Sequence, residues 1–334
     1  MMFGTAAKWF RHLALATTLL AVCVVSLGAY VRLSDAGLGC PDWPGCFGTM
    51  TVPESEAAIK QAQAAFPDSD FDHGKAWKEM LHRYLAGTLG LMVLALAILG
   101  WRARRLIQVS PWTPTALLVL VTFQAMLGMW TVTMLLKPAV VTAHLLGGMA
   151  TLALLTWITH RHWGVVSGRF VKAGGLRAAI RLGLLVLFAQ IMLGGWTSTN
   201  YAALACTDFP TCHGEWLPPM DFSNAFHWIR DLGESIDGTP LSLAALTAIQ
   251  WTHRIGALVV LVYFGLLVWR LLRVEYVSNV SLLLLTLLLV QIALGVANLL
   301  LHLPLVLAVG HNLGAALLVV TLVVLNSKIT ELPK

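Results

Sequence analysis

Apolar residues occur in eight long runs, separated by shorter polar segments. Each run is long enough to cross a bilayer as a helix, which takes roughly 20 residues. The runs are residues 12–32, 76–100, 113–136, 140–160, 178–199, 243–272, 278–301 and 305–326. Long segments follow the first and fifth runs, and within the first of them residues 54–65 have the pattern of a short amphipathic helix. The pattern predicts an all-α membrane protein with eight transmembrane helices.

The second four runs repeat the first four, so we predict two tandem, pseudo-symmetric four-helix bundles, residues 1–175 and 176–334. The repeat is carried by short motifs in the same order. The pairs are Cys40-x-Asp-Trp-Pro-x-Cys46 with Cys206-x-Asp-Phe-Pro-x-Cys212, Glu79-x-x-His82-Arg83 with Gln250-x-x-His253-Arg254, and Gln124-x-x-Leu-Gly128 before His144 with Gln291-x-x-Leu-Gly295 before His311. The offset between equivalent residues is about 166 to 171 in the numbering.

Composition and charge support a membrane location. The chain is 58% hydrophobic and 11% charged, whereas a soluble domain carries about 25% charged residues. Basic residues gather on one side of the eight-span arrangement, and the positive-inside rule makes that side cytoplasmic. They are Lys8, Arg11, Arg102, Arg104, Arg105, Arg161, Arg169, Lys172, Arg177, Arg181, Arg270, Arg273, Lys328 and Lys334, with Glu275 and Glu331 as acidic exceptions. We therefore expect a multi-pass protein of a bacterial inner membrane with both termini cytoplasmic, and no nucleic-acid binding.

Four histidines lie inside the predicted spans, one to two turns from the outer ends: His82, His144, His253 and His311. A single such histidine could simply bond to a neighbouring helix, but ionisable residues within a membrane are costly and invite a functional interpretation. Two facing imidazoles from a helical bundle can be the axial ligands of a haem. The repeat therefore predicts two haem sites. Arg83 and Arg254 follow two of these histidines and are expected either to pair with haem propionates or to reach the lipid headgroups.

The two predicted haem sites differ at one acidic position. Glu79 lies three residues before His82, on the same helix face, whereas its repeat counterpart is the neutral Gln250. A solvated surface role for Glu79 is the simpler alternative. A carboxylate beside the first haem could instead move protons or stabilise positive charge. This difference predicts that only the first site carries out chemistry.

Four cysteines lie in the predicted outer loops, as the pairs Cys40 with Cys46 and Cys206 with Cys212. The outer compartment is oxidising, so two local disulfides are expected. A structural role is favoured over redox-active thiols, and the spacing is unusual for zinc. The fifth cysteine, Cys23, is expected to be a small buried apolar residue.

Together these motifs resemble the haem A synthase family, the cytochrome oxidase assembly proteins that convert haem O into haem A. The resemblance covers nearly the whole chain. It implies that His253 and His311 bind a haem b cofactor. It also implies that the substrate haem O lies at the first site, with Glu79, His82 and His144 as the catalytic residues. The implied reaction oxidises the C8 methyl group of haem O to a formyl group through successive hydroxylation.

The resemblance further implies haem O synthase, cytochrome oxidase assembly factors and an unidentified electron acceptor as partners. Two other functions stay open. A dihaem electron-transfer protein would use all four histidines as permanent ligands, but it does not explain the difference between Glu79 and Gln250. A haem carrier would bind haem O without changing it.

Overall fold

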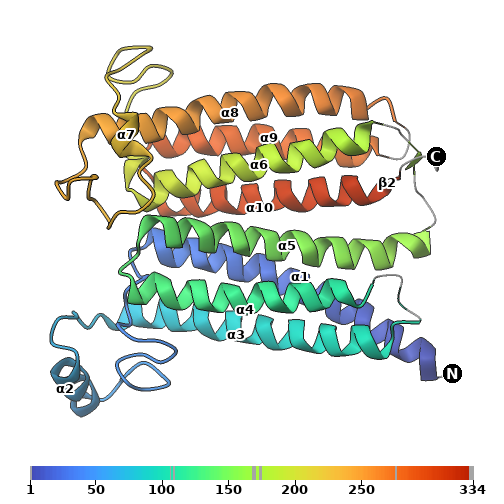
Figure 1. Ribbon diagram of the computed structural model, residues 1–334, viewed down its shortest axis with the longest axis horizontal. Coiled ribbons are helices and arrows are strands. Elements are labelled where there is room, and N and C mark those ends of the chain that lie inside the picture. Colours follow the sequence, from blue (N-terminus) through green and yellow to red (C-terminus); the bar gives the residue numbers. More distant parts are fainter. Residues whose placement is uncertain are drawn as a thin grey trace.

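The computed structural model describes residues 2–105, 107, 110–167, 171–172, 175–274 and 277–330. Within these ranges the regular secondary structure is helical apart from one pair of two-residue strands (Figure 1). Of the charged residues used to predict the orientation, Arg169, Glu275, Glu331 and Lys334 lie outside the described residues.

Eight helices in the described ranges are long and apolar enough to cross a membrane. They are α1 (Met2–Leu33), α3 (His73–Arg102), α4 (Trp112–Thr133), α5 (Pro138–Ser167), α6 (Leu176–Thr199), α8 (Leu243–Leu271), α9 (Ser278–Leu300) and α10 (Leu305–Lys328). Each coincides with one predicted run, so the all-α membrane class is confirmed. α1 and α5 extend well beyond their apolar runs, because basic and polar residues continue a helix as readily as apolar ones.

The shorter elements lie outside the membrane-spanning helices. α2 (Glu56–Ala65) confirms the predicted amphipathic segment, and Ser55 caps it. The 3₁₀ helix η1 (Ala202–Leu204) and α7 (Phe222–Ala225) were not predicted. Neither was the parallel pairing of β1 (Val171–Lys172) with β2 (Ile329–Thr330), which joins segments far apart in the sequence.

Each group of four helices packs as a ring. α1 and α4 each contact both α3 and α5, and in the same way α6 and α9 each contact both α8 and α10. The histidine-bearing helices α3 and α5 therefore stand at opposite corners of one ring, and α8 and α10 at opposite corners of the other. Figure 1 shows the two groups one above the other, in contact through α5, α6, α10 and α1. That the groups are separate domains stays a prediction.

Both long loops lie at one end of the molecule, with α2 and α7, while the start of α1 and the strand β2 lie at the other (Figure 1). Polar caps fix the starts of two histidine-bearing helices at the loop end. The side chain of Asp72 accepts a bond from the Lys75 N–H at the start of α3, and Ser242 does the same for Ala245 in α8. Such caps satisfy backbone donors that the first helical turn leaves free.

One apolar core runs through both groups, with fully buried residues such as Phe10, Leu155, Phe264 and Leu322. The prediction for Cys23 was wrong, since this side chain is exposed on α1. A lipid-facing position places an apolar residue in apolar surroundings just as well as a protein core does, so composition alone does not separate the two.

Candidate functional site

One large cavity extends from the loop end into both helical rings. Its volume is about 1910 Å³, against roughly 300–1,000 Å³ for an ordinary small-molecule pocket. All four span histidines line it: His82, His144, His253 and His311. The structure therefore brings together the four residues that the repeat singled out, in a space large enough for bulky ligands.

Each of these imidazoles packs against a glycine of the neighbouring helix. A Cβ atom placed on Gly28 of α1 would lie 2.9 Å from Cε1 of His82, and one placed on Gly194 of α6 would lie 3.0 Å from Cε1 of His253. The same contact joins Gly128 to His144 and Gly295 to His311, at 3.4 and 3.1 Å. A larger residue at these positions would displace the ring. The glycines therefore decide how closely each imidazole approaches the adjacent helix.

Glutamines of the neighbouring helices hold three of the four histidines. Gln124 donates to the main-chain oxygen of His144 at 2.8 Å. Gln190 donates to the main-chain oxygen of His253 at 2.9 Å, and its amide nitrogen lies 3.0 Å from Nδ1 of the same ring.

The third glutamine, Gln291, acts on His311 through its main chain. Nδ1 of His311 lies 3.1 Å from the Gln291 carbonyl oxygen. A ring that donates from Nδ1 keeps Nε2 free to bind a metal, and such partners fix the orientation of metal ligands.

Each glutamine side chain also fits against a glycine three residues after the histidine. A Cβ atom on Gly147, Gly256 or Gly314 would collide with the amide oxygen of Gln124, Gln190 or Gln291. From the sequence, Gln124 and Gln291 were only markers of the repeat, and Gln190 was not predicted to have a role. A sequence signal could have found them. Each glutamine lies four residues before the glycine that contacts the imidazole, and a second glycine lies three residues after the histidine.

His82 is the exception. The position equivalent to Gln190 is Val24, and the position equivalent to Gly256 is Leu85. Nδ1 of His82 is buried and has no hydrogen-bond partner in the described part of the chain. Of the two histidines of the first ring, only His144 is tied to a glutamine. The first site therefore holds its histidines less firmly than the second.

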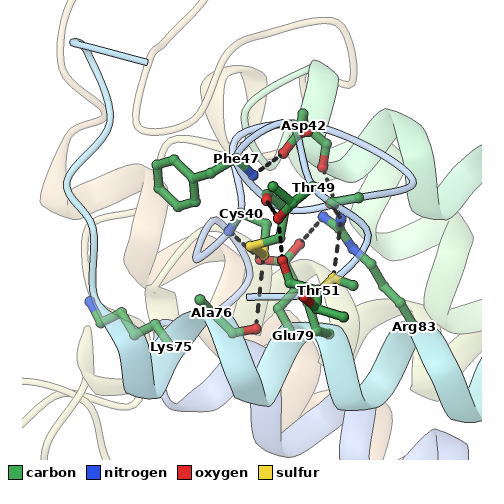
Figure 2. The surroundings of a disulfide bond; sticks show 12 residues. Cys40, Asp42, Phe47, Thr49, Thr51, Lys75, Ala76, Glu79 and Arg83 are labelled. Carbon is green, nitrogen blue, oxygen red and sulfur yellow. Dashed lines mark hydrogen bonds and ion pairs between the residues drawn. A yellow bond between two sulfur atoms is a disulfide. The ribbon is translucent and has the colours of Figure 1, made fainter. Parts of the chain in front are cut away.

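Glu79 and Gln250 occupy equivalent places, and each accepts the same kind of hydrogen bond. The Cys40 N–H donates to Oε2 of Glu79 at 2.9 Å (Figure 2). In the second half the Cys206 N–H donates to Oε1 of Gln250 at 2.9 Å. Both side chains are buried. Each one ties the first cysteine of its loop to the histidine-bearing helix, so the pair has a common structural role.

The two side chains differ in the partner of their other terminal atom, which is an oxygen in Glu79 and a nitrogen in Gln250. Oε1 of Glu79 forms an ion pair with Arg83 at 2.5 Å. Nε2 of Gln250 instead donates to the main-chain oxygen of Ala203 at 2.5 Å. Among the described residues, only the first site thus has a buried carboxylate at the cavity wall, and that carboxylate is held by an arginine.

Arg83 and Arg254 hold the two cysteine loops. Arg83 donates to the main-chain oxygens of Asp42, at 2.9 Å, and of Gly45. Arg254 donates to the main-chain oxygens of Thr211, Asp208 and Cys206, at 2.8 to 3.1 Å. Both arginines also line the cavity. Their predicted role at haem propionates stays a prediction.

The predicted disulfides Cys40–Cys46 and Cys206–Cys212 are confirmed. Each loop is closed by an aspartate, since Asp42 accepts from the N–H groups of Phe47 and Gly48, and Asp208 from those of His213 and Gly214. Bonds from the Thr211 hydroxyl and from these N–H groups hold the pKa of Asp208 below its usual range. His213 lies close to the sulfurs of Cys206 and Cys212, but disulfide sulfurs are not thiolate ligands. The arrangement supports a structural role for the pairs.

A polar bridge joins the two rings of helices at the loop end of the cavity. Arg32 donates to the Tyr201 hydroxyl at 3.0 Å and to the main-chain oxygen of Ser198 at 3.1 Å, and the Tyr201 hydroxyl donates to Asp35 at 3.2 Å. Arg32 and Ser198 are equivalent in the repeat, as are Asp35 and Tyr201. Because equivalent residues contact each other, the bridge lies where the two halves face one another.

Comparisons with known proteins agree with the resemblance seen in the motifs. Residues 11–323 match the family COX15-CtaA, described as cytochrome oxidase assembly protein. A Heme A synthase of Shewanella oneidensis is 44% identical over 320 residues, which is 95% of each chain. A Heme A synthase of Caulobacter vibrioides is 30% identical over 318 residues, 88% of each chain. One of Halalkalibacterium halodurans is 28% identical over 239 residues, 70% of this chain and 72% of the relative. With a match over most of its length, the chain belongs to the COX15-CtaA family of cytochrome oxidase assembly proteins.

Proposed function

We propose that the chain acts as a haem A synthase, oxidising the C8 methyl group of haem O to a formyl group by successive hydroxylations and loss of water. The observation that carries the proposal is the cavity lined by two pairs of histidines, with a carboxylate beside one pair. Haem O synthase would supply the substrate, and cytochrome oxidase assembly factors would receive the product. An electron acceptor would take up the electrons released by the oxidation.

The residues present fit two haems held by two histidines each. Four imidazoles line one cavity, and each packs against a glycine. Nδ1 of His82 and of His144 is buried without a partner in the described chain. We assign haem b to His253 and His311, because Gln190 and Gln291 hold both. We assign the substrate to His82 and His144, because a ligand that must leave suits a site in which His82 is less firmly held.

Glu79 is then the residue that acts on the substrate. Its carboxylate lies three residues from His82 and is kept in place by the Cys40 N–H and by Arg83. A fixed negative charge at this point stabilises positive charge that develops on the substrate, and the same oxygens accept a proton. Haem b, when bound, supplies one-electron redox chemistry. Arg83 and Arg254 bring positive charge to the outer rim, where propionates would be neutralised.

Replacing Gln190 by Val gives the second site the residue that the first site has at the equivalent position, Val24. We expect the affinity for haem b to fall by roughly 10- to 100-fold, the range seen when residues that support a metal ligand are lost. The measurement is the low-spin haem absorbance of purified protein during haem b titration. Val24→Ile, a change beside His82 only, is the matched control and should leave haem b binding unchanged. Unaltered haem b affinity in Gln190→Val would contradict the assignment of a supporting role.

Replacing Glu79 by Gln makes the first site imitate the second. The Cys40 N–H keeps an acceptor, as it has with Gln250 in the other half, so folding and haem b content should persist. Loss of the charge should slow formation of haem A by roughly 100-fold or more, with haem O or a hydroxylated form accumulating. Extracted pigments identified by mass provide the measurement. The control Gln250→Glu should keep wild-type output, and wild-type output from Glu79→Gln would remove the carboxylate from the chemistry.

We also propose that the cysteine loops face the outside of a bacterial inner membrane and that both termini are cytoplasmic. The distribution of basic residues supports this orientation. Alkaline phosphatase, which is active only outside the cytoplasm, should be inactive when fused after Lys328 and active when inserted near Asp68. The reverse pattern would overturn the orientation.

A further inference from the structure

The two halves of the cavity differ in depth. On α3 and α4 the cavity wall includes Leu91, Leu94 and Leu118. Their equivalents on α8 and α9 are Val262, Gly265 and Leu285, and none of these is among the described residues that line the cavity. The first half of the cavity therefore continues further along its helices, toward the end opposite the cysteine loops.

The deeper part lies in the seam between α3 and α4, and two glycines make room for it. No described atom outside the adjacent α3 backbone lies within 4 Å of a Cβ atom placed on Gly87, and one placed on Gly90 would meet only Val121, at 3.8 Å. The equivalent residues in α8 are Leu258 and Leu261. Both glycines and both leucines line the cavity. The same seam is thus open in the first half and filled by side chains in the second.

The space has a definite size and character. From His82 to Leu94 the helix rises about 18 Å, at about 1.5 Å per residue. The walls are mainly apolar, because the hydroxyls of Thr88 and Thr122, which also line the cavity, donate to main-chain oxygens of their own helices. Leu91 and Leu94 are 69% and 41% exposed, so the space also opens sideways toward the lipid. We call it the α3/α4 slot, lined by Gly87, Gly90, Leu91, Leu94, Leu118 and Val121.

We propose that the α3/α4 slot binds the long isoprenoid substituent of haem O and thereby distinguishes haem O from haem b. This inference rests on the proposed function. The slot begins beside His82, so a porphyrin held there can extend an apolar chain directly into it. Haem b has no such chain, and the second half, where Leu258 and Leu261 stand, offers no slot of this depth. The sideways opening lets the chain enter from the bilayer together with the ring.

A lipid acyl chain has the same apolar chemistry, but the slot's continuity with the histidine site favours a chain attached to the porphyrin. Burial of each methylene group in an apolar site favours binding, and a few of them suffice for a tenfold preference. Selectivity between the two haems is therefore the property to measure.

The test fills the α3/α4 slot with the side chains found at the equivalent positions of the second half. The double variant Gly87→Leu with Gly90→Leu gives α3 the leucines that α8 has at Leu258 and Leu261. Purified protein is titrated with haem O and, separately, with haem b, and binding to the first half is followed after the second is filled with haem b. We expect the wild type to prefer haem O and the variant to lose that preference by at least about tenfold, with haem b binding unchanged. Gly265→Leu on α8, where a Cβ atom meets nothing within 4 Å, is the matched control.

Each other outcome is decisive. A variant that keeps the wild-type preference for haem O overturns the slot but leaves the proposed function intact, provided that the wild type binds haem O and forms haem A. A wild type that binds no haem O at the first half overturns both. If extraction instead finds a phospholipid that the double variant loses while haem O selectivity stays constant, the slot belongs to lipid. Haem b bound in the second half reports whether the variant is folded. If the double leucine variant loses this haem b, the milder double variant Gly87→Ala with Gly90→Ala is measured in its place, and we expect it to lose less of the preference for haem O.

Discussion

Close contact between an imidazole and a glycine on the next helix is the constraint on which the rest of this structure depends. It occurs four times, between Gly28 and His82 and at the three equivalent places. Polar rings are costly inside a membrane, and small residues let helices approach closely enough to enclose them. Because α3 and α5 stand at opposite corners of one ring of helices, and α8 and α10 at opposite corners of the other, these contacts direct all four imidazoles into a shared cavity.

On this common frame, a few substitutions give the halves different properties. Val24 replaces Gln190, so His82 lacks the support that His253 has. Glu79 replaces Gln250, so a loop-holding side chain acquires a charge without losing its bond to the cysteine N–H. Gly87 replaces Leu258, and the seam beside His82 opens. Each change leaves the first half with a less supported histidine, a buried charge or more space, and these differences support the proposed division between a substrate half and a cofactor half.

Much of this could be predicted from the sequence. Apolar runs define the membrane helices because the bilayer sets their length, and the repeat identified the four histidines, Glu79 and both disulfides. The glutamine supports were missed because they act between helices. The spacing of glutamine and glycine is visible in the sequence, but its meaning depends on the packing that places Gln190 of α6 beside His253 of α8. The bridge of Arg32 and Tyr201 was missed for the same reason. Cys23 was misplaced because lipid and protein interior favour the same residue types.

That the first half handles the substrate while the second keeps a cofactor is tested most directly by identifying the haems of single-site variants. Protein produced with a supply of haem O would be purified, and its pigments extracted and identified by mass. We expect His82→Ala to retain haem b and to lose the isoprenoid-bearing haem, and His311→Ala to lose haem b. Equal loss of the same pigment from both variants, or haem b alone in the wild type, would contradict this division and favour an electron-transfer protein with two equivalent haems.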